Sequence, residues 1–226
     1  MCGRFTLSSS AEVLEEYFEL DSAPQGLMPR YNIAPAQAVA IIRQVEGLGR
    51  HMDSVRWGLI PSWSKEAAIG HHLINARAET VAEKPSFRAA FKRRRCLVPA
   101  DGFYEWKPVH GRKQPYWIGL QDRPPLGLAG LWEHWEDPDS GEHIETCAII
   151  TTQANRQMRD IHPRMPVILP KSAYTAWLAV DSPADVLHDL LLPYPEPTLI
   201  SYPVSRSLNN PQNDTQELLL PVDAEQ

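Results

Sequence analysis

Cys2, directly after the initiator methionine, is the residue whose position offers the most chemistry in this chain. A cysteine beside the initiator is small enough for methionine aminopeptidases to remove Met1, and Cys2 would then carry a free α-amine next to its thiol. The pKa of an α-amine is about 7.7 to 8.0, so near neutral pH a substantial fraction is unprotonated and nucleophilic. The amine can attack an aldehyde, and the neighbouring thiol can then add to the imine and close a five-membered thiazolidine. The alternative is that Cys2 is an ordinary residue near a disordered terminus.

Three other residues have the side chains that such a reaction needs. Imine formation requires a carboxylate to move protons, a histidine to bind or protonate a departing hydroxyl, and an amide to orient a polar substrate. Glu105, His162 and Asn75 supply these groups. Each has a plainer interpretation, since a glutamate between aromatic residues is also typical of a paired structural carboxylate and a histidine before proline is typical of a loop. Spacing alone does not show that the three converge on Cys2.

The composition predicts an intracellular globular protein without cofactor or metal. The chain has 226 residues, of which 43% are hydrophobic and 22% charged, enough for one domain with a core. It lacks a secretory signal and the run of about 18 apolar residues that would cross a membrane. The three cysteines show no CxxC spacing, and Cys96 and Cys147 are expected to be inert core thiols. The net charge of −6 argues against charge-driven coating of duplex nucleic acid, but it permits a local basic groove.

Hydrophobic periodicity predicts a β-rich chain with short helices. Ser9, with Glu12 three residues later, is a capping-box pattern that starts the first helix. Residues 96–99 and 103–107 are predicted to form a hairpin joined by an Ala-Asp-Gly turn. Ser182 is the predicted N-cap of a helix over residues 183–191. Further strands are expected at 3–7, 38–43, 51–60, 115–120, 126–135, 145–152, 167–169 and 198–204, and further helices at 84–94, 154–161 and 171–178.

The chain shows no internal domain boundary. Its scattered prolines favour many turns over one flexible linker, which predicts a single domain over residues 1–208. From Asn209 the sequence becomes polar, and residues 209–226 are predicted to form a mobile C-terminal tail.

Six segments, in the same order along the chain, resemble the motifs of the SRAP family (SOS-response-associated peptidase), whose members are abasic-site processing proteins. They are residues 2–5 (CGRF), 31–35 (YNIAP), 57–61 (WGLIP), 75–80 (NARAET), 96–106 (CLVPADGFYEW) and 162–166 (HPRMP). The resemblance implies an α+β fold with a β-barrel-like core of mostly antiparallel strands and several short peripheral helices. It also implies a basic groove for single-stranded DNA and a pocket for an abasic deoxyribose.

Site residues follow from the same resemblance. Cys2 matches the nucleophile that forms a stable thiazolidine cross-link with the ring-opened sugar, and Glu105 matches the acid/base. His162 matches the histidine that assists ring opening and cross-link reversal, and Asn75 the active-site asparagine.

Four residues are candidates for contacts with DNA. Arg4, Arg77 and Arg164 fall in matching motifs, and their charge suits flanking phosphates. Trp63 departs somewhat from the aromatic residues usual in the family, and a base-stacking role is its predicted function.

Two other functions compete with this interpretation. In a thiol peptidase or N-terminal-nucleophile amidohydrolase, the Cys2 thiol would attack a carbonyl with the α-amine as base, and the obvious bond for self-processing is Met1–Cys2. A passive single-strand-binding module would need no free aminothiol. We expect a cytoplasmic monomer that binds abasic single-stranded DNA at the nucleoid and no membrane, with any replication-associated partner unspecified.

Overall fold

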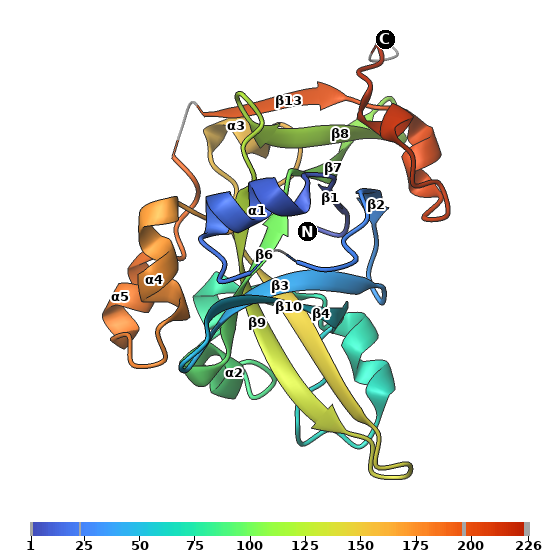
Figure 1. The fold of residues 1–226 in the computed structure, drawn as a ribbon. Coiled ribbons are helices and arrows are strands. Elements are labelled where there is room, and N and C mark those ends of the chain that lie inside the picture. The colour runs from blue at the N-terminus through green and yellow to red at the C-terminus, as the bar shows by residue number, and fades with distance from the viewer. Residues whose placement is uncertain (1, 23, 196–197, 224–226) are drawn as a thin grey trace.

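A five-stranded antiparallel sheet holds the start of the chain (Figure 1). The computed structural model describes residues 2–22, 24–195 and 198–223. In spatial order the strands of this sheet are β13 (Leu199–Pro203), β8 (Arg112–Leu120), β7 (Gly102–Val109), β1 (Phe5–Leu7) and β2 (Arg30–Ile33). The short strand β1 therefore lies between β7 and β2, so both neighbours fix the position of the N-terminal residues.

The remaining strands form a larger sheet that closes on itself. Neighbouring strands pair in the order β10, β4, β3, β6 and β9, and β9 pairs with β10 to complete a ring. Most of these pairings are antiparallel, whereas β10 pairs in parallel with β4 and β5. The strands of this sheet are β3 (Ala38–Val45), β4 (Gly49–Trp57), β5 (Asn75–Arg77), β6 (Arg95–Ala100), β9 (Leu126–Glu136), β10 (His143–Gln153), β11 (Arg164–Pro166) and β12 (Ile168–Leu169). The closed ring confirms the predicted α+β fold with a β-barrel-like core.

The helices are short and lie outside the strands, with α4 beside α5 (Figure 1). The α-helices are α1 (Ala11–Phe18), α2 (Arg88–Arg93), α3 (Arg156–Arg159), α4 (Tyr174–Leu178) and α5 (Ala184–Asp189), and the 3-10 helices are η1 (Ala67–His72), η2 (Ala78–Thr80), η3 (Lys171–Ala173), η4 (Arg206–Asn209) and η5 (Gln216–Leu219). None of the helices in the described ranges has the length and apolar character that crossing a bilayer would require.

The two predicted helix caps are wrong because other partners engage both serines. Helix α1 starts one residue later than expected, with Ser10 as the N-cap accepting from the Val13 N–H at 3.4 Å. The hydroxyl and N–H of Ser9 donate to Asp101 instead. Before α5, the Ser182 hydroxyl donates to the Ala176 carbonyl, and Pro183 occupies the N-cap position.

The predicted hairpin at residues 96–107 is also wrong. Strand β6 pairs with β3 and β9 in the closed ring, whereas β7 pairs with β1 and β8 in the other sheet. The chain changes sheets at Asp101, whose N–H donates to the Thr6 carbonyl at 2.7 Å. Its carboxylate accepts from the N–H and hydroxyl groups of Ser8 and Ser9. These long-range bonds make the segment a corner between sheets, although its sequence is that of a turn.

The apolar core fills the ring and extends beneath β1. Phe5, Cys96 and Cys147 are all fully buried in it, as predicted for the two core thiols. A second, smaller cluster lies on the other face of the five-stranded sheet, where Tyr104 and Trp117 pack against η4 and η5.

Much of the polar C-terminal segment packs against the domain. Leu218 is buried in the second cluster, and Val204 forms a β-bridge with Pro221. Polar composition alone did not suggest these contacts. The last three residues of the predicted tail, 224–226, lie outside the described residues.

Candidate active site

The register of β1 against β7 brings Cys2 close to Glu105. Phe5 pairs with Phe103, and the Tyr104 N–H donates to the Arg4 carbonyl at 2.9 Å. Continuing this antiparallel pairing by one residue places Gly3 opposite Glu105, with Cys2 immediately beyond. Cys2 is fully buried. Burial, and secondarily the Glu105 charge, raises the pKa of the Cys2 thiol well above its usual range, so the thiol is protonated near neutral pH.

Asn75 holds the main chain of Cys2 from the opposite sheet. It starts β5, where it pairs with Ile149 of β10, and its Nδ2 donates to the Cys2 carbonyl at 2.9 Å. The Oδ1 atom of Asn75 is buried and has no hydrogen-bond partner within the described part of the chain. A buried oxygen without a partner costs about 1–3 kcal/mol. The amide therefore anchors Cys2 and leaves an acceptor for a ligand.

Glu105 and His162 face each other near this point. The Glu105 carboxylate is 2% exposed, and its Oε1 lies 3.8 Å from Nδ1 of His162, an electrostatic contact longer than a hydrogen bond. Burial raises the pKa of Glu105, and the proximity of His162 opposes part of that rise. His162 lies just before β11, where its Nδ1 is 3.1 Å from the Arg164 nitrogen and 3.0 Å from the Arg164 oxygen. These main-chain contacts fix the imidazole beside the carboxyl group.

A cavity of about 470 Å³ opens beside this pair. It is lined by Glu105, Trp106, Lys113, His162 and Asn209. Sequence reasoning missed three of these residues. Trp106 could have been found as the neighbour of Glu105, but no sequence signal singled out Lys113 or Asn209. No group of three His, Cys, Asp or Glu side chains suited to a metal ion occurs in the described ranges.

Two of the predicted DNA-contacting arginines are engaged inside the protein. Nη1 of Arg4 donates to Oδ1 of Asn32 at 2.9 Å and to the Leu208 carbonyl at 3.0 Å. Arg164 forms a two-pronged ion pair with Glu79 and also donates to the Thr151 carbonyl at 2.6 Å. Both guanidinium groups therefore have structural partners in the absence of DNA.

Arg77 and Trp63 differ from these two arginines in exposure. Arg77 ends β5 and is exposed, two residues after Asn75 and so on the same side of the strand. Trp63 is 58% exposed, and its indole Nε1 donates to the Pro85 carbonyl at 3.4 Å. Trp63 does not line the cavity beside Glu105 and His162. The structure thus brings Cys2, Asn75, Glu105 and His162 together. Of these four, Glu105 and His162 line the cavity, whereas Arg77 and Trp63 do not.

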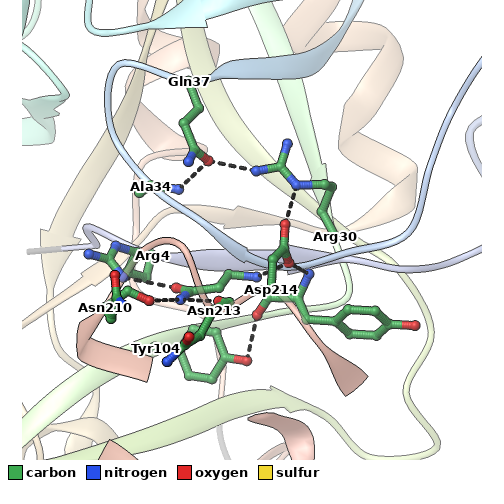
Figure 2. Close-up of polar contacts among 10 residues, drawn as sticks. Arg4, Arg30, Ala34, Gln37, Tyr104, Asn210, Asn213 and Asp214 are labelled. Atoms are coloured by element: carbon green, nitrogen blue, oxygen red, sulfur yellow. Dashed lines mark hydrogen bonds and ion pairs between the residues drawn. The ribbon is translucent and has the colours of Figure 1, made fainter. Parts of the chain in front are cut away.

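A polar network around Asn32 ties the C-terminal segment to the start of the chain (Figure 2). Asn32 is fully buried, and its Nδ2 lies within 3.1 Å of the carbonyl oxygens of Leu208, Asn210 and Asn213. Asp214 accepts from the N–H groups of Tyr31 and Asn32 and pairs with Arg30. We call residues 208–214 the C-terminal clamp. Asn32 lies in one of the six motifs, but its partners Asn210 and Asn213 lie in the segment, 209–226, that composition predicted to be mobile.

Comparisons with known proteins agree with the resemblance seen in the motifs. A family model described as SOS response associated peptidase (SRAP) matches residues 1–211. The abasic site processing protein YoqW of Bacillus subtilis is 44% identical over 223 residues, which cover 97% of this chain and 99% of the relative. The abasic site processing protein HMCES of Pongo abelii is 32% identical, over 88% of this chain and 67% of its own length. A crystal structure of a Bacteroides thetaiotaomicron protein superposes with a TM-score of 0.87 at 28% identity, covering 98% of this chain and all of that one.

Proposed function

The chain belongs to the SRAP (SOS response associated peptidase) family, and we propose that it processes abasic sites in DNA through a covalent bond to Cys2. The names of its relatives support the substrate class, because YoqW and HMCES are both called abasic site processing proteins. The observation that carries the proposal is the convergence on Cys2 of an amide, a buried carboxyl group and an imidazole.

The proposed reaction begins once Met1, which lies outside the described residues, has been removed. The liberated α-amine of Cys2 adds to the aldehyde C1′ of the ring-opened abasic sugar, and loss of water gives an imine. The Cys2 sulfur then bonds to the same carbon, its proton passes to the nitrogen, and the thiazolidine closes. One molecule of water is the only by-product.

The protonation state of the thiol supports this order of steps. A buried thiol with a raised pKa is a poor nucleophile at neutral pH, since the thiolate is the reactive form. An α-amine, by contrast, is substantially neutral there. The amine therefore attacks first, and the positive charge of a protonated imine beside the sulfur then favours the thiolate.

In the proposed reaction, Glu105 and His162 carry out the proton transfers. Glu105, a buried carboxyl with a raised pKa, can donate the proton with which water leaves and accept one in return. His162 is placed to assist opening of the sugar ring and reversal of the cross-link. Asn75 orients Cys2 by donating from Nδ2 to the Cys2 carbonyl, and its Oδ1 can accept a hydrogen bond from a sugar hydroxyl.

The proposed DNA substrate is single-stranded. The net charge of −6 provides little general attraction for a duplex, whereas local cations and aromatic faces suit one strand. Arg77 is the leading phosphate contact, with Trp63 as a stacking surface further along the strand. Arg4 and Arg164 remain secondary contacts, because a guanidinium has five N–H donors and internal partners use only some of them. We propose a cytoplasmic protein that lies at the nucleoid when it is bound to DNA.

A denaturing gel after incubation with abasic single-stranded DNA tests the proposal. We expect intact mass to show loss of Met1 and the gel to show a heat-stable adduct. Inserting one alanine between Met1 and Cys2 should abolish the adduct, because the terminal amine then no longer belongs to a cysteine. An adduct at the wild-type rate in that variant would exclude the aminothiol reaction.

The Cys2→Ser variant separates the competing functions. A serine amine still forms a reversible imine but loses the stable thiazolidine, whereas a thiol peptidase would lose all activity and a passive binder none of its affinity. Hydrolysis of a peptide substrate by wild-type protein, without an adduct, would favour the peptidase.

A further inference from the structure

We propose that Lys113 and Asn209 form an anion subsite in the cavity beside Glu105 and His162, and that this subsite binds a phosphodiester flanking the abasic sugar. The inference rests on the proposed function, because the anion it identifies belongs to the same DNA strand. The nearest anions to the reacting C1′ are the phosphates on C3′ and C5′ of the same sugar.

The cavity has room for more than a sugar. Its volume of about 470 Å³ lies within the range of roughly 300–1,000 Å³ typical of pockets that enclose drug-sized ligands. A deoxyribose without its base is much smaller than such a ligand. The space therefore fits the sugar together with an attached phosphate.

Lys113 supplies the positive charge. It lies on β8 opposite Pro108 of β7, and it is the only lysine or arginine among the described residues that line the cavity. No ion pair joins it to a carboxylate in the part of the chain that the structure describes. The ammonium group can thus neutralise a phosphate that enters the cavity.

Asn209 supplies a fixed neutral donor. The indole Nε1 of Trp106 donates to Oδ1 of Asn209 at 2.8 Å. An indole N–H can only donate, so the amide orientation is determined and Nδ2 is the remaining donor. Nδ2 has no hydrogen-bond partner among the described residues. Asn209 ends η4 within the C-terminal clamp, so the Asn32 network, which binds the carbonyl groups of Leu208 and Asn210 on either side, holds this donor in place.

The partners of the two engaged arginines strengthen the assignment. Arg4 donates to Asn32 and Leu208, and Arg164 pairs with Glu79. Within the described ranges Lys113 has no such ion-pair partner, and it lies on the cavity wall itself. It is therefore better placed than Arg4 or Arg164 to meet a phosphate next to the reacting sugar.

The experiment measures affinity for single-stranded DNA that carries a non-reactive abasic analogue, by fluorescence anisotropy across salt concentrations. We expect Lys113→Ala to bind about three- to tenfold more weakly at low salt. The slope of log affinity against log salt should flatten by about 0.7, which corresponds to one single-strand phosphate contact. Arg112→Ala is the matched control, because it removes the same charge one residue away at a position that does not line the cavity. Equal losses in the two variants would overturn the subsite.

Two further arms locate the anion and test Asn209. A neutral methylphosphonate at the contacted phosphate should weaken wild-type binding but not the binding of Lys113→Ala, whereas the same change at the other flank should weaken both. Asn209→Asp keeps an acceptor for Trp106 but replaces the donor with a negative charge, and we expect it to bind at least as weakly as Lys113→Ala. The subsite would be contradicted if the losses of affinity from Lys113→Ala and from the methylphosphonate were additive at both flanks. Unchanged affinity of Asn209→Asp would also contradict it. Failure of wild-type protein to form an adduct would instead contradict the proposed function.

Discussion

Cys2 and Glu105 are two acidic groups that are buried at the same point of the molecule. Burial raises the pKa of both the thiol and the carboxyl group, and His162 opposes part of the rise at Glu105. A carboxyl group whose pKa is shifted towards neutrality can both donate and accept a proton at physiological pH, as imine formation requires. The same burial opposes ionisation, so Glu105 should affect both rate and stability.

Replacing Glu105 with glutamine should slow cross-linking by about 10²- to 10⁴-fold, the usual contribution of a positioned acid or base. The amide keeps the size of the side chain, so affinity for DNA with a non-reactive abasic analogue should stay within a few-fold. Single-turnover time courses beside this affinity measurement check the prediction. The control is Glu142→Gln, which makes the same substitution at an exposed position. The reverse change at nearby Gln114 would not serve, because Gln114 is buried and donates to the Val204 carbonyl. A loss of rate that merely follows a loss of affinity would reduce Glu105 to a binding residue.

The pH dependence of stability should also change in Glu105→Gln. The folded-state pKa of Glu105 is raised above its unfolded value, so the folded protein holds this proton more tightly than the unfolded chain does. The stabilisation is full below the unfolded pKa and is lost as pH rises through the folded pKa. Relative to wild type, Glu105→Gln should therefore gain stability between acidic and neutral pH. Urea unfolding across that interval measures the difference, and parallel curves for the two proteins would contradict the assigned shift.

At the scale of elements, the C-terminal clamp joins the two ends of the chain. Asn32 bridges carbonyl groups of residues 208–213 and also accepts from Arg4, two residues after Cys2. The packing of this clamp thus determines where β1 begins and how Asn209 meets the cavity.

Asn32→Ala should destabilise the protein by about 3 kcal/mol or more, because it removes the buried amide that donates to three carbonyl groups of the clamp and accepts one hydrogen bond from Arg4. The clamp should also become sensitive to proteases before the rest of the chain. Urea unfolding and limited proteolysis with mass analysis measure the two effects. Gln212→Ala, at an exposed position of the same segment, should change stability by no more than about 0.5 kcal/mol. Similar stability and protease sensitivity of the two variants would show that the clamp does not stabilise the protein.

Elements that follow from local pattern were predictable from the sequence. Apolar runs in the long strands β8, β9 and β10 marked their positions closely. The corner at Asp101 was not predictable, since its Ala-Asp-Gly sequence is typical of a hairpin and its partners Ser8 and Ser9 lie about 90 residues earlier. Because Ser9 donates to Asp101, Ser10 is the N-cap of α1 in its place.

The candidate site was predictable to a different degree for each of its parts. The motifs led to Cys2, Asn75, Glu105 and His162, which the structure brings together. They did not reveal that internal partners engage Arg4 and Arg164, because a charged residue in a motif has the same appearance whether or not it faces a ligand. Lys113 and Asn209 join the site only through the pairing of β7 with β8 and the folding back of the C-terminus.

At the scale of the whole molecule, the site lies where a closed ring of strands meets a second sheet. Asn75 belongs to β5, which pairs with β10 of the ring, whereas Glu105 belongs to β7 of the five-stranded sheet and Cys2 lies just before β1 of that sheet. The hydrogen bond from Asn75 to Cys2 crosses between these units. The chemistry therefore depends on how firmly the sheets are joined, and Asp101 is a joint between them.

Asp101→Ala should loosen this joint and slow the reaction without removing any group that touches the substrate. The substitution leaves the main-chain N–H groups of Ser8 and Ser9 without their acceptor, and bonds to a charged group each contribute about 1.5–3 kcal/mol. We expect a loss of about 3 kcal/mol in the free energy of unfolding. Ser8 and Ser9 directly follow β1, so the cross-linking rate should also fall at temperatures where the variant remains folded. Asp139→Ala, at an exposed turn, is the control and should change neither quantity appreciably. Asp101→Asn keeps one oxygen acceptor and should recover part of both losses. A destabilised Asp101→Ala protein that cross-links at the wild-type rate would show that the site keeps its geometry without the joint.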